Sequence, residues 1–224
     1  MKTLLVIACA AGAIALFLVL PFLVAGAPLA YELYVNQKIL FYHAPSAWVM
    51  FTSVFVCGIA SVGYLRTRKP SWDDTAAAAG DLVVAFGLIT LTTGPIWGKV
   101  AWGTWWVWDA RLTSSLLLWM IFLAYALIRR YGGPGSERLA AGLALFGAAD
   151  VPLVYFAVNF WKTQHPTNSA VPTLQSGMRL AFWLAVLAMH LFYVALLVAR
   201  RSVREGERRL QGAHDLALDA GLLE

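Results

Sequence analysis

The chain has 224 residues, of which 60% are hydrophobic and only 13% carry a charged side chain. A typical soluble domain carries about 25% charged residues, so the composition excludes an ordinary soluble protein. The net charge is +5, but the basic residues form no separate domain, which argues against nucleic-acid binding. The excess of positive charge instead indicates membrane topology and attraction to anionic lipid.

Six apolar runs approach or exceed the roughly 20 residues that a transmembrane helix requires. They are predicted at about 3–26, 46–65, 77–97, 112–130, 138–160 and 177–199. The runs are continuous rather than alternating, which disfavours a β-barrel. The sequence therefore predicts an all-α polytopic membrane protein, with a six-helix domain at 1–200 and a tail at 201–224. The length of the first run favours a retained anchor over a cleaved signal peptide.

Lysine and arginine are distributed unequally between the two ends of these runs. With the N-terminus inside, five of the 17 basic residues fall outside and twelve fall inside. Because basic residues favour the cytoplasmic side, both termini are predicted to lie in the cytoplasm. Three outer loops follow from this orientation, at roughly 27–45, 98–111 and 161–176.

The second outer loop contains 102-WGTWWVWDAR-111, with four tryptophans in ten residues. Interfacial tryptophans commonly anchor a helix end, which explains scattered residues well. Four indoles beside Asp109 and Arg111 cannot all face lipid in either a helical or an extended segment. Some of this indole surface is therefore predicted to contact a flat, apolar partner other than lipid.

The first and third outer loops each contain a histidine followed by a proline: His43 before Pro45, and His165 before Pro166. Proline restricts the preceding backbone, so both histidines are predicted in ordered turns at the outer membrane edge. Imidazoles from two loops can supply both axial ligands of a haem iron. Outer cations such as Lys38 and Arg111 suit its two carboxylates. The residues alone leave a generic ligand or partner surface as the rival interpretation.

Among the ionisable residues, His190 and Asp150 lie well inside predicted spans. His190 lies roughly 20 Å from the outer end of its run at 1.5 Å per residue, and no other intramembrane histidine is predicted to pair with it. Hydrogen bonding within the core is the favoured interpretation. Asp150 precedes Pro152, and is predicted to stabilise a helix kink, with a proton or substrate path as the alternative.

Three ordered motifs resemble one known family. The segment 102-WGTWWVWDARLTS-114 is similar to the tryptophan-rich signature of haem-handling proteins in cytochrome c biogenesis. The same proteins have two outer histidine motifs. These motifs are similar to the segments 39-ILFYHAPSA-47 and 152-PLVYFAVNFWKTQHP-166. Together they resemble the cytochrome c maturation protein C family, CcmC, over roughly residues 35–200.

The resemblance implies a function and a site. Haem b would be held on the periplasmic face of the bacterial inner membrane and passed to the haem chaperone CcmE. The ATP-binding cassette complex CcmA/CcmB would drive release, and the small membrane protein CcmD would assist. His43 and His165 would ligate the iron. The other site residues would be Lys38, Trp102, Gly103, Trp105, Trp106, Trp108, Asp109 and Arg111.

Other functions are weighed against this interpretation. A CcsA-type cytochrome c synthetase, which is an enzyme, typically has proline and then glutamate after the aspartate, where this chain has Ala110 and Arg111. A b-type electron-transfer cytochrome would place histidine pairs inside its helices, and a permease is compatible with the topology. A haem-delivery protein rather than an enzyme is therefore expected. The family often has an acidic residue before the tyrosine that corresponds to Tyr31. This chain departs from that pattern, because it has Ala30 before the tyrosine and Glu32 after it.

Overall fold

The computed structural model describes residues 2–28, 35–166 and 174–222, and these residues are almost entirely helical. The elements are α1 (Lys2–Gly26), the short 3-10 helix η1 (Val35–Ile39), α2 (Leu40–Thr67), α3 (Pro70–Trp102), α4 (Ala110–Tyr131), α5 (Ser136–Phe160) and α6 (Ser176–Asp219). Six helices are long and apolar enough to cross a membrane. The predicted all-α polytopic fold is confirmed. Residues 30–32, where the departure from the family pattern falls, lie outside the described residues.

Two helices begin or end beyond the predicted apolar runs. The helix α2 starts at Leu40, so the prediction that His43 and Pro45 lie in a turn was wrong. The helix continues through Pro45, which has no N–H to donate to the carbonyl of Phe41 one turn earlier. The helix α3 ends at Trp102, and Gly103 follows in the left-handed conformation at φ +78°, donating its N–H to the carbonyl of Lys99.

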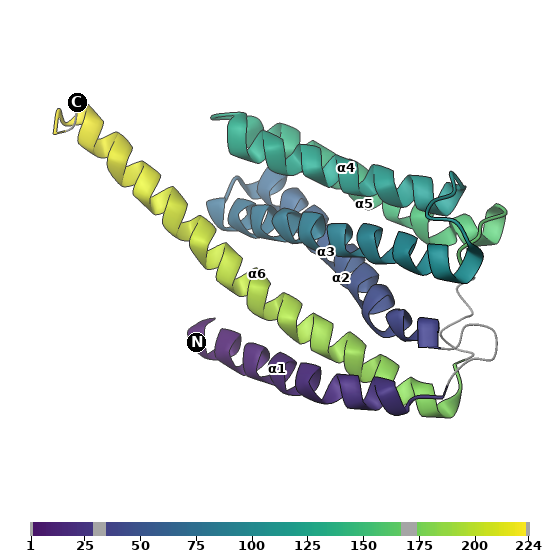
Figure 1. The fold of residues 1–224 in the computed structure, drawn as a ribbon. Helices are drawn as coiled ribbons and strands as arrows, with labels where there is room; N and C mark the ends of the chain where they lie inside the picture. Colours follow the sequence, from purple (N-terminus) through teal and green to yellow (C-terminus); the bar gives the residue numbers. More distant parts are fainter. Residues whose placement is uncertain (1, 29–34, 167–173, 223–224) are drawn as a thin grey trace.

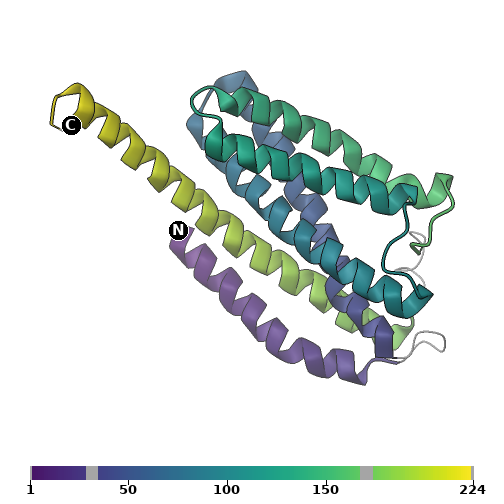
Figure 2. The same cartoon turned by 45° about the horizontal axis from the view of Figure 1, so that its top comes forward.

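The helices pack as two outer pairs around a central pair. Figures 1 and 2 show α1 alongside α6 and α4 alongside α5, with α2 and α3 between these pairs. Aromatic side chains of α3 and α4 fill the main core, among them Phe86, Phe122 and Tyr125. A second core joins α1, α2 and α6 through Leu20, Phe41 and Phe182. The site described below lies at the end of the bundle that carries loops 103–109 and 161–166, called here the tryptophan end.

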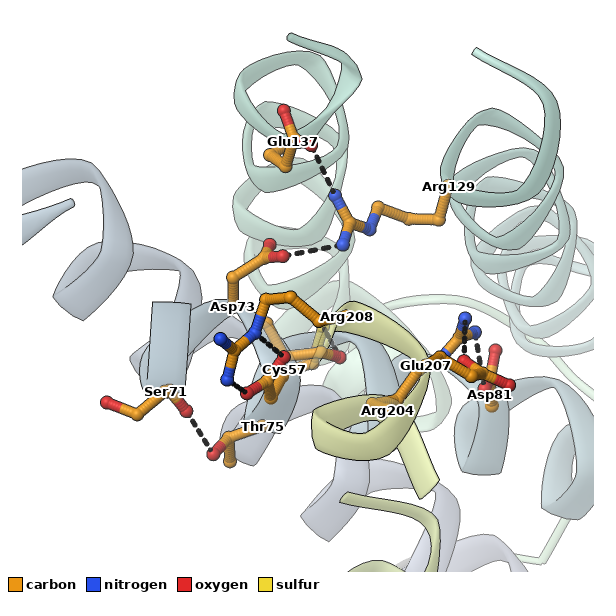
Figure 3. Close-up of polar contacts among 12 residues, drawn as sticks. Cys57, Ser71, Asp73, Thr75, Asp81, Arg129, Glu137, Arg204, Glu207 and Arg208 are labelled. Carbon is orange, nitrogen blue, oxygen red and sulfur yellow. Dashed lines mark hydrogen bonds and ion pairs between the residues drawn. The ribbon is translucent and has the colours of Figure 1, made fainter. Parts of the chain in front are cut away.

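Ion pairs fix the opposite end of the bundle, called here the arginine end. Figure 3 shows two of these pairs, Asp73 with Arg129 at 2.6 Å and Asp81 with Arg204 at 2.8 Å. Asp74 pairs with Arg208 at 2.8 Å, and Asp81 also pairs with Arg200 at 2.7 Å. Residues 201–219, predicted as part of a tail outside the six-helix domain, continue α6 without a break. The continuation brings Arg204 and Arg208 against α3, and so joins this part of the tail to the bundle.

Candidate functional site

A pocket of about 750 Å³ lies at the tryptophan end between α2, α3, α4 and the two loops. Its walls include His43, Trp97, Trp102, Trp106, Arg111 and His165. Parts of all three motifs, far apart in the sequence, therefore meet around one cavity.

His43 is buried in the first turns of α2, with 8% of its surface exposed. Its Nδ1 lies 2.9 Å from Oγ1 of Thr93 on α3. The Thr93 hydroxyl donates its single proton to the carbonyl of Ile89 at 2.7 Å, so its oxygen accepts from Nδ1–H of His43. Nε2 of His43 then keeps a free lone pair. Gly94 permits this arrangement, because a Cβ atom there would lie 3.2 Å from Cε1 of the ring.

His165 reaches the same pocket from the loop after α5. Its Nδ1 lies 2.8 Å from the carbonyl oxygen of Pro166, which can only accept, so Nδ1 carries the proton and Nε2 the lone pair. Burial, and then the positive charge of Arg111, lower the pKa of His165 to about 4. The imidazole is therefore neutral at physiological pH and available as a donor to a metal.

Tryptophan rings form the apolar wall of the pocket. Trp97, which the sequence analysis missed, is 7% exposed and packs edge-on against His43 with ring centroids 5.9 Å apart. Trp102 lies against Trp97 at 6.1 Å. The indole N–H groups of Trp97 and Trp106 are buried without a hydrogen-bond partner among the described residues.

Two tryptophans of the loop are largely exposed and differ in their contact with the pocket. Trp105 is 58% exposed and lines the rim, whereas Trp108 is 75% exposed and does not line the cavity. Trp108 instead packs edge-on against Trp106 at 5.7 Å, and so supports a pocket residue from behind. The cluster thus has an inner part that faces the cavity and an outer part that faces away from the bundle.

Asp109 and Arg111 join α4 to its neighbours: Asp109 bonds to the third loop, and Arg111 bonds to α5. Asp109 caps α4 by accepting the N–H of Leu112 at 2.9 Å, and its second oxygen accepts the N–H of Gln164 at 3.0 Å. Arg111 donates through Nη1 to the carbonyl of Val154 at 2.7 Å, which ties α4 to α5. Asp109 thus ties the start of α4 to the loop that carries His165. Its bond to the residue before His165 was not foreseen.

Other predicted site residues lie outside the cavity. Lys38 donates from Nζ to the carbonyl of Ala25 at 3.1 Å, and Gly103 serves as the C-cap of α3. Neither residue lines the pocket. Asp150 is buried, and its Oδ2 has no hydrogen-bond partner in the described part of the chain. Its role at the Pro152 kink stays a prediction.

Comparison with known proteins agrees with the motifs. A model of the family described as "Heme exporter protein C", CcmC, matches residues 1–214. The chain belongs to this family. The heme exporter protein C of Bradyrhizobium diazoefficiens is 38% identical over 174 residues, covering 77% of this chain and 66% of that protein. The Paracoccus denitrificans protein of the same name is 34% identical over 214 residues, covering 86% of this chain and 88% of its own length.

A plant relative shares the core of the heme exporter protein C family. A "putative cytochrome c biosynthesis ccmC-like mitochondrial protein" of Marchantia polymorpha is 37% identical over 134 residues, covering 60% of this chain and 57% of that protein. The chain thus spans less than two thirds of the length of the Marchantia and Bradyrhizobium relatives. The predicted membership of the CcmC family is confirmed, while the individual ligand assignments remain predictions.

Proposed function

We propose that this protein holds haem b in the pocket at the tryptophan end and delivers it to the chaperone CcmE during c-type cytochrome biogenesis. One observation carries the proposal: two histidines with free Nε2 lone pairs line one apolar cavity. The names of the relatives, which refer to haem export and cytochrome c biosynthesis, support the same cargo.

The donor set suits a haem iron. Bis-imidazole ligation requires both rings neutral and unprotonated at the nitrogen that faces the metal. The acceptors at Nδ1 of His43 and His165 fix this tautomer in both rings. One ligand comes from α2 and the other from the loop after α5, so the two can approach a flat macrocycle from different directions.

The rest of the pocket suits the porphyrin. The rings of Trp97, Trp102 and Trp106 offer apolar faces that exclude water from a planar ligand. The buried N–H groups of Trp97 and Trp106 would donate to carboxylate oxygens of the cargo. Arg111 also lines the pocket, and within the described residues its guanidinium, which has five N–H donors, bonds to backbone carbonyls through Nη1 alone.

Delivery needs a face that a partner can reach. The exposed indoles of Trp105 and Trp108 are available for CcmE to dock beside the cargo. The protein would contribute proximity and orientation to the transfer, which makes it a delivery protein rather than an enzyme in this proposal. CcmA/CcmB would supply the energy for release, and CcmD would complete the assembly.

The orientation of the bundle in the membrane follows from charge. The arginine end carries Arg129, Arg204 and Arg208, so it would face the cytoplasm of a bacterium with both termini. The tryptophan end would then lie on the periplasmic face of the inner membrane, where CcmE is expected to act.

The ligation is tested by spectroscopy of the purified full chain loaded with haem. His43→Ala or His165→Ala is expected to weaken haem retention and to replace the low-spin spectrum by a high-spin one, because each removes an axial donor. Added imidazole would restore part of the low-spin signal. An unchanged spectrum in both variants would refute bis-histidine ligation.

A further inference from the structure

A second cavity forms a groove between α2, α5 and α6. Aromatic side chains dominate its walls: Trp48, Phe51 and Phe55 from α2, and Tyr155 and Phe156 from α5. Phe55 is 47% exposed and Phe156 is also 47% exposed, although both lie within membrane-spanning helices. The groove is therefore open at the side of the bundle, toward the lipid.

His190 of α6 presents a ring nitrogen in this groove. Its Nδ1 lies 2.8 Å from the carbonyl of Val186, which can only accept, so Nδ1 carries the proton. The neighbour of its Nε2 is Oγ1 of Thr52 at 3.4 Å, but this hydroxyl donates its proton to the carbonyl of Trp48 at 2.9 Å. Nε2 of His190 is therefore unprotonated, and it accepts at most the long 3.4 Å bond from Thr52.

The groove and the pocket at the tryptophan end share a wall. Phe51 lines both cavities. Thr52, next to His190, lies nine residues after His43 on α2, which is roughly 13 Å along a helix that rises 1.5 Å per residue. Arg111 lines the pocket and donates to the carbonyl of Tyr155, a groove residue, at 3.1 Å. The guanidinium of Arg111 therefore lies where the two cavities approach each other.

We propose that this groove is a lateral haem-binding site, in which His190 ligates the iron of a haem that enters from the lipid before it reaches the pocket. The inference rests on the proposed function, because it assigns the same cargo to a second place. The chemistry that recognises haem is present: a neutral imidazole nitrogen, flat aromatic walls, and access from an apolar solvent. The carboxylates of the cargo would point toward Arg111, which spares them burial in lipid.

The two sites differ in their expected spectrum, which makes the inference testable. Two imidazoles give a low-spin iron, whereas His190 alone gives a high-spin iron. The full chain in lipid nanodiscs is titrated with ferric haem, and albumin then extracts the unbound haem. We expect the wild type to retain both spectral components, and His190→Ala to lose only the high-spin one. His214→Ala, in the exposed distal part of α6, is the control and should retain both.

A second pair of variants avoids any change at the histidine. Phe156→Ala removes a groove wall, and Phe146→Ala removes a phenylalanine of the same helix that is 60% exposed and does not line the groove. We expect Phe156→Ala to lose most of the high-spin component and Phe146→Ala to keep it. Equal retention in these two variants would overturn the inference and would leave the groove to lipid chains.

The double variant His43→Ala/His165→Ala separates the two proposals. If both hold, it loses the low-spin component and keeps the high-spin haem at His190. If it keeps the low-spin component, the proposed function fails at its ligands. If the wild type retains only low-spin haem and His190→Ala matches it, the lateral site is refuted while the pocket stands.

Discussion

Thr93→Val would test how the pocket prepares His43 to bind a metal. Valine keeps the shape of threonine and removes the hydroxyl that lies 2.9 Å from Nδ1 of His43. The ring is only 8% exposed, so its N–H would lose its acceptor without gaining water. Loss of such a supporting bond typically lowers metal affinity about 10- to 100-fold, which is about 1.4 to 2.7 kcal/mol. Haem affinity is expected to fall by this factor, and the low-spin fraction to fall with it.

The neighbouring threonine supplies a matched control. Thr92 is exposed, and among the residues that the structure describes its hydroxyl bonds only to the carbonyls of Leu88 and Ile89 in its own helix. Thr92→Val should therefore bind haem like the wild type, and Thr93→Ser, which keeps a hydroxyl, should retain most of the affinity. The assay is a haem titration of the purified chain, followed by its absorption spectrum. Equal affinities for Thr93→Val and Thr92→Val would refute the argument that Thr93 fixes the tautomer of His43.

Three further predictions concern the loop and the topology. The double change of Trp105 and Trp106 to alanine removes stacking surface worth about 1–3 kcal/mol per buried ring. We expect it to abolish formation of the haem–chaperone adduct, measured as adduct per folded molecule. If this ratio stays at the wild-type level, the cluster is a membrane anchor. Asp109→Asn keeps only one of the two acceptor oxygens and places an NH2 donor against the N–H of Leu112 or Gln164, so it should weaken haem retention, and Asp109→Ala, which removes both acceptors, should weaken it further, as measured by the same titration. A reporter fused after Gly132 should be cytoplasmic and one after Gln175 exported, because of the charge asymmetry; one compartment for both would contradict the six-span topology.

The sequence was sufficient to predict the six helices, because each has to satisfy its backbone within an apolar run long enough to cross a bilayer. The predicted start of α2 was too late, because His43 is polar and Pro45 is a helix-breaking residue, so both were placed before the apolar run. A helix that begins in an apolar bundle tolerates both. The extension of α6 to Asp219 was hidden for a related reason: its arginines look solvated in the sequence, but Arg204 and Arg208 pair with acids of α3.

The candidate site was predictable where residue type alone points to chemistry. Histidine, tryptophan and arginine in outer loops led to His43, His165, Trp106 and Arg111, which do line one pocket. Thr93 was not predictable, because its role depends on the packing of α3 against α2 and threonine is common in helices. Trp97 carried a weak signal, as a tryptophan at the end of an apolar run, but only the fold shows that it packs against His43.

The two histidines are held with unequal rigidity, and this difference suits delivery. His43 belongs to a buried helix, and a side chain of the neighbouring α3 fixes its ring. His165 belongs to a loop whose link to the bundle includes the bond from the N–H of Gln164 to Asp109. Loops open at a lower free energy than packed helices, so under the proposed function a ligand on this loop could leave the iron while His43 stays in place. The bond of Asp109 to Gln164 would then set how tightly the cargo is held, which would give the aspartate of the tryptophan segment a role beyond capping α4.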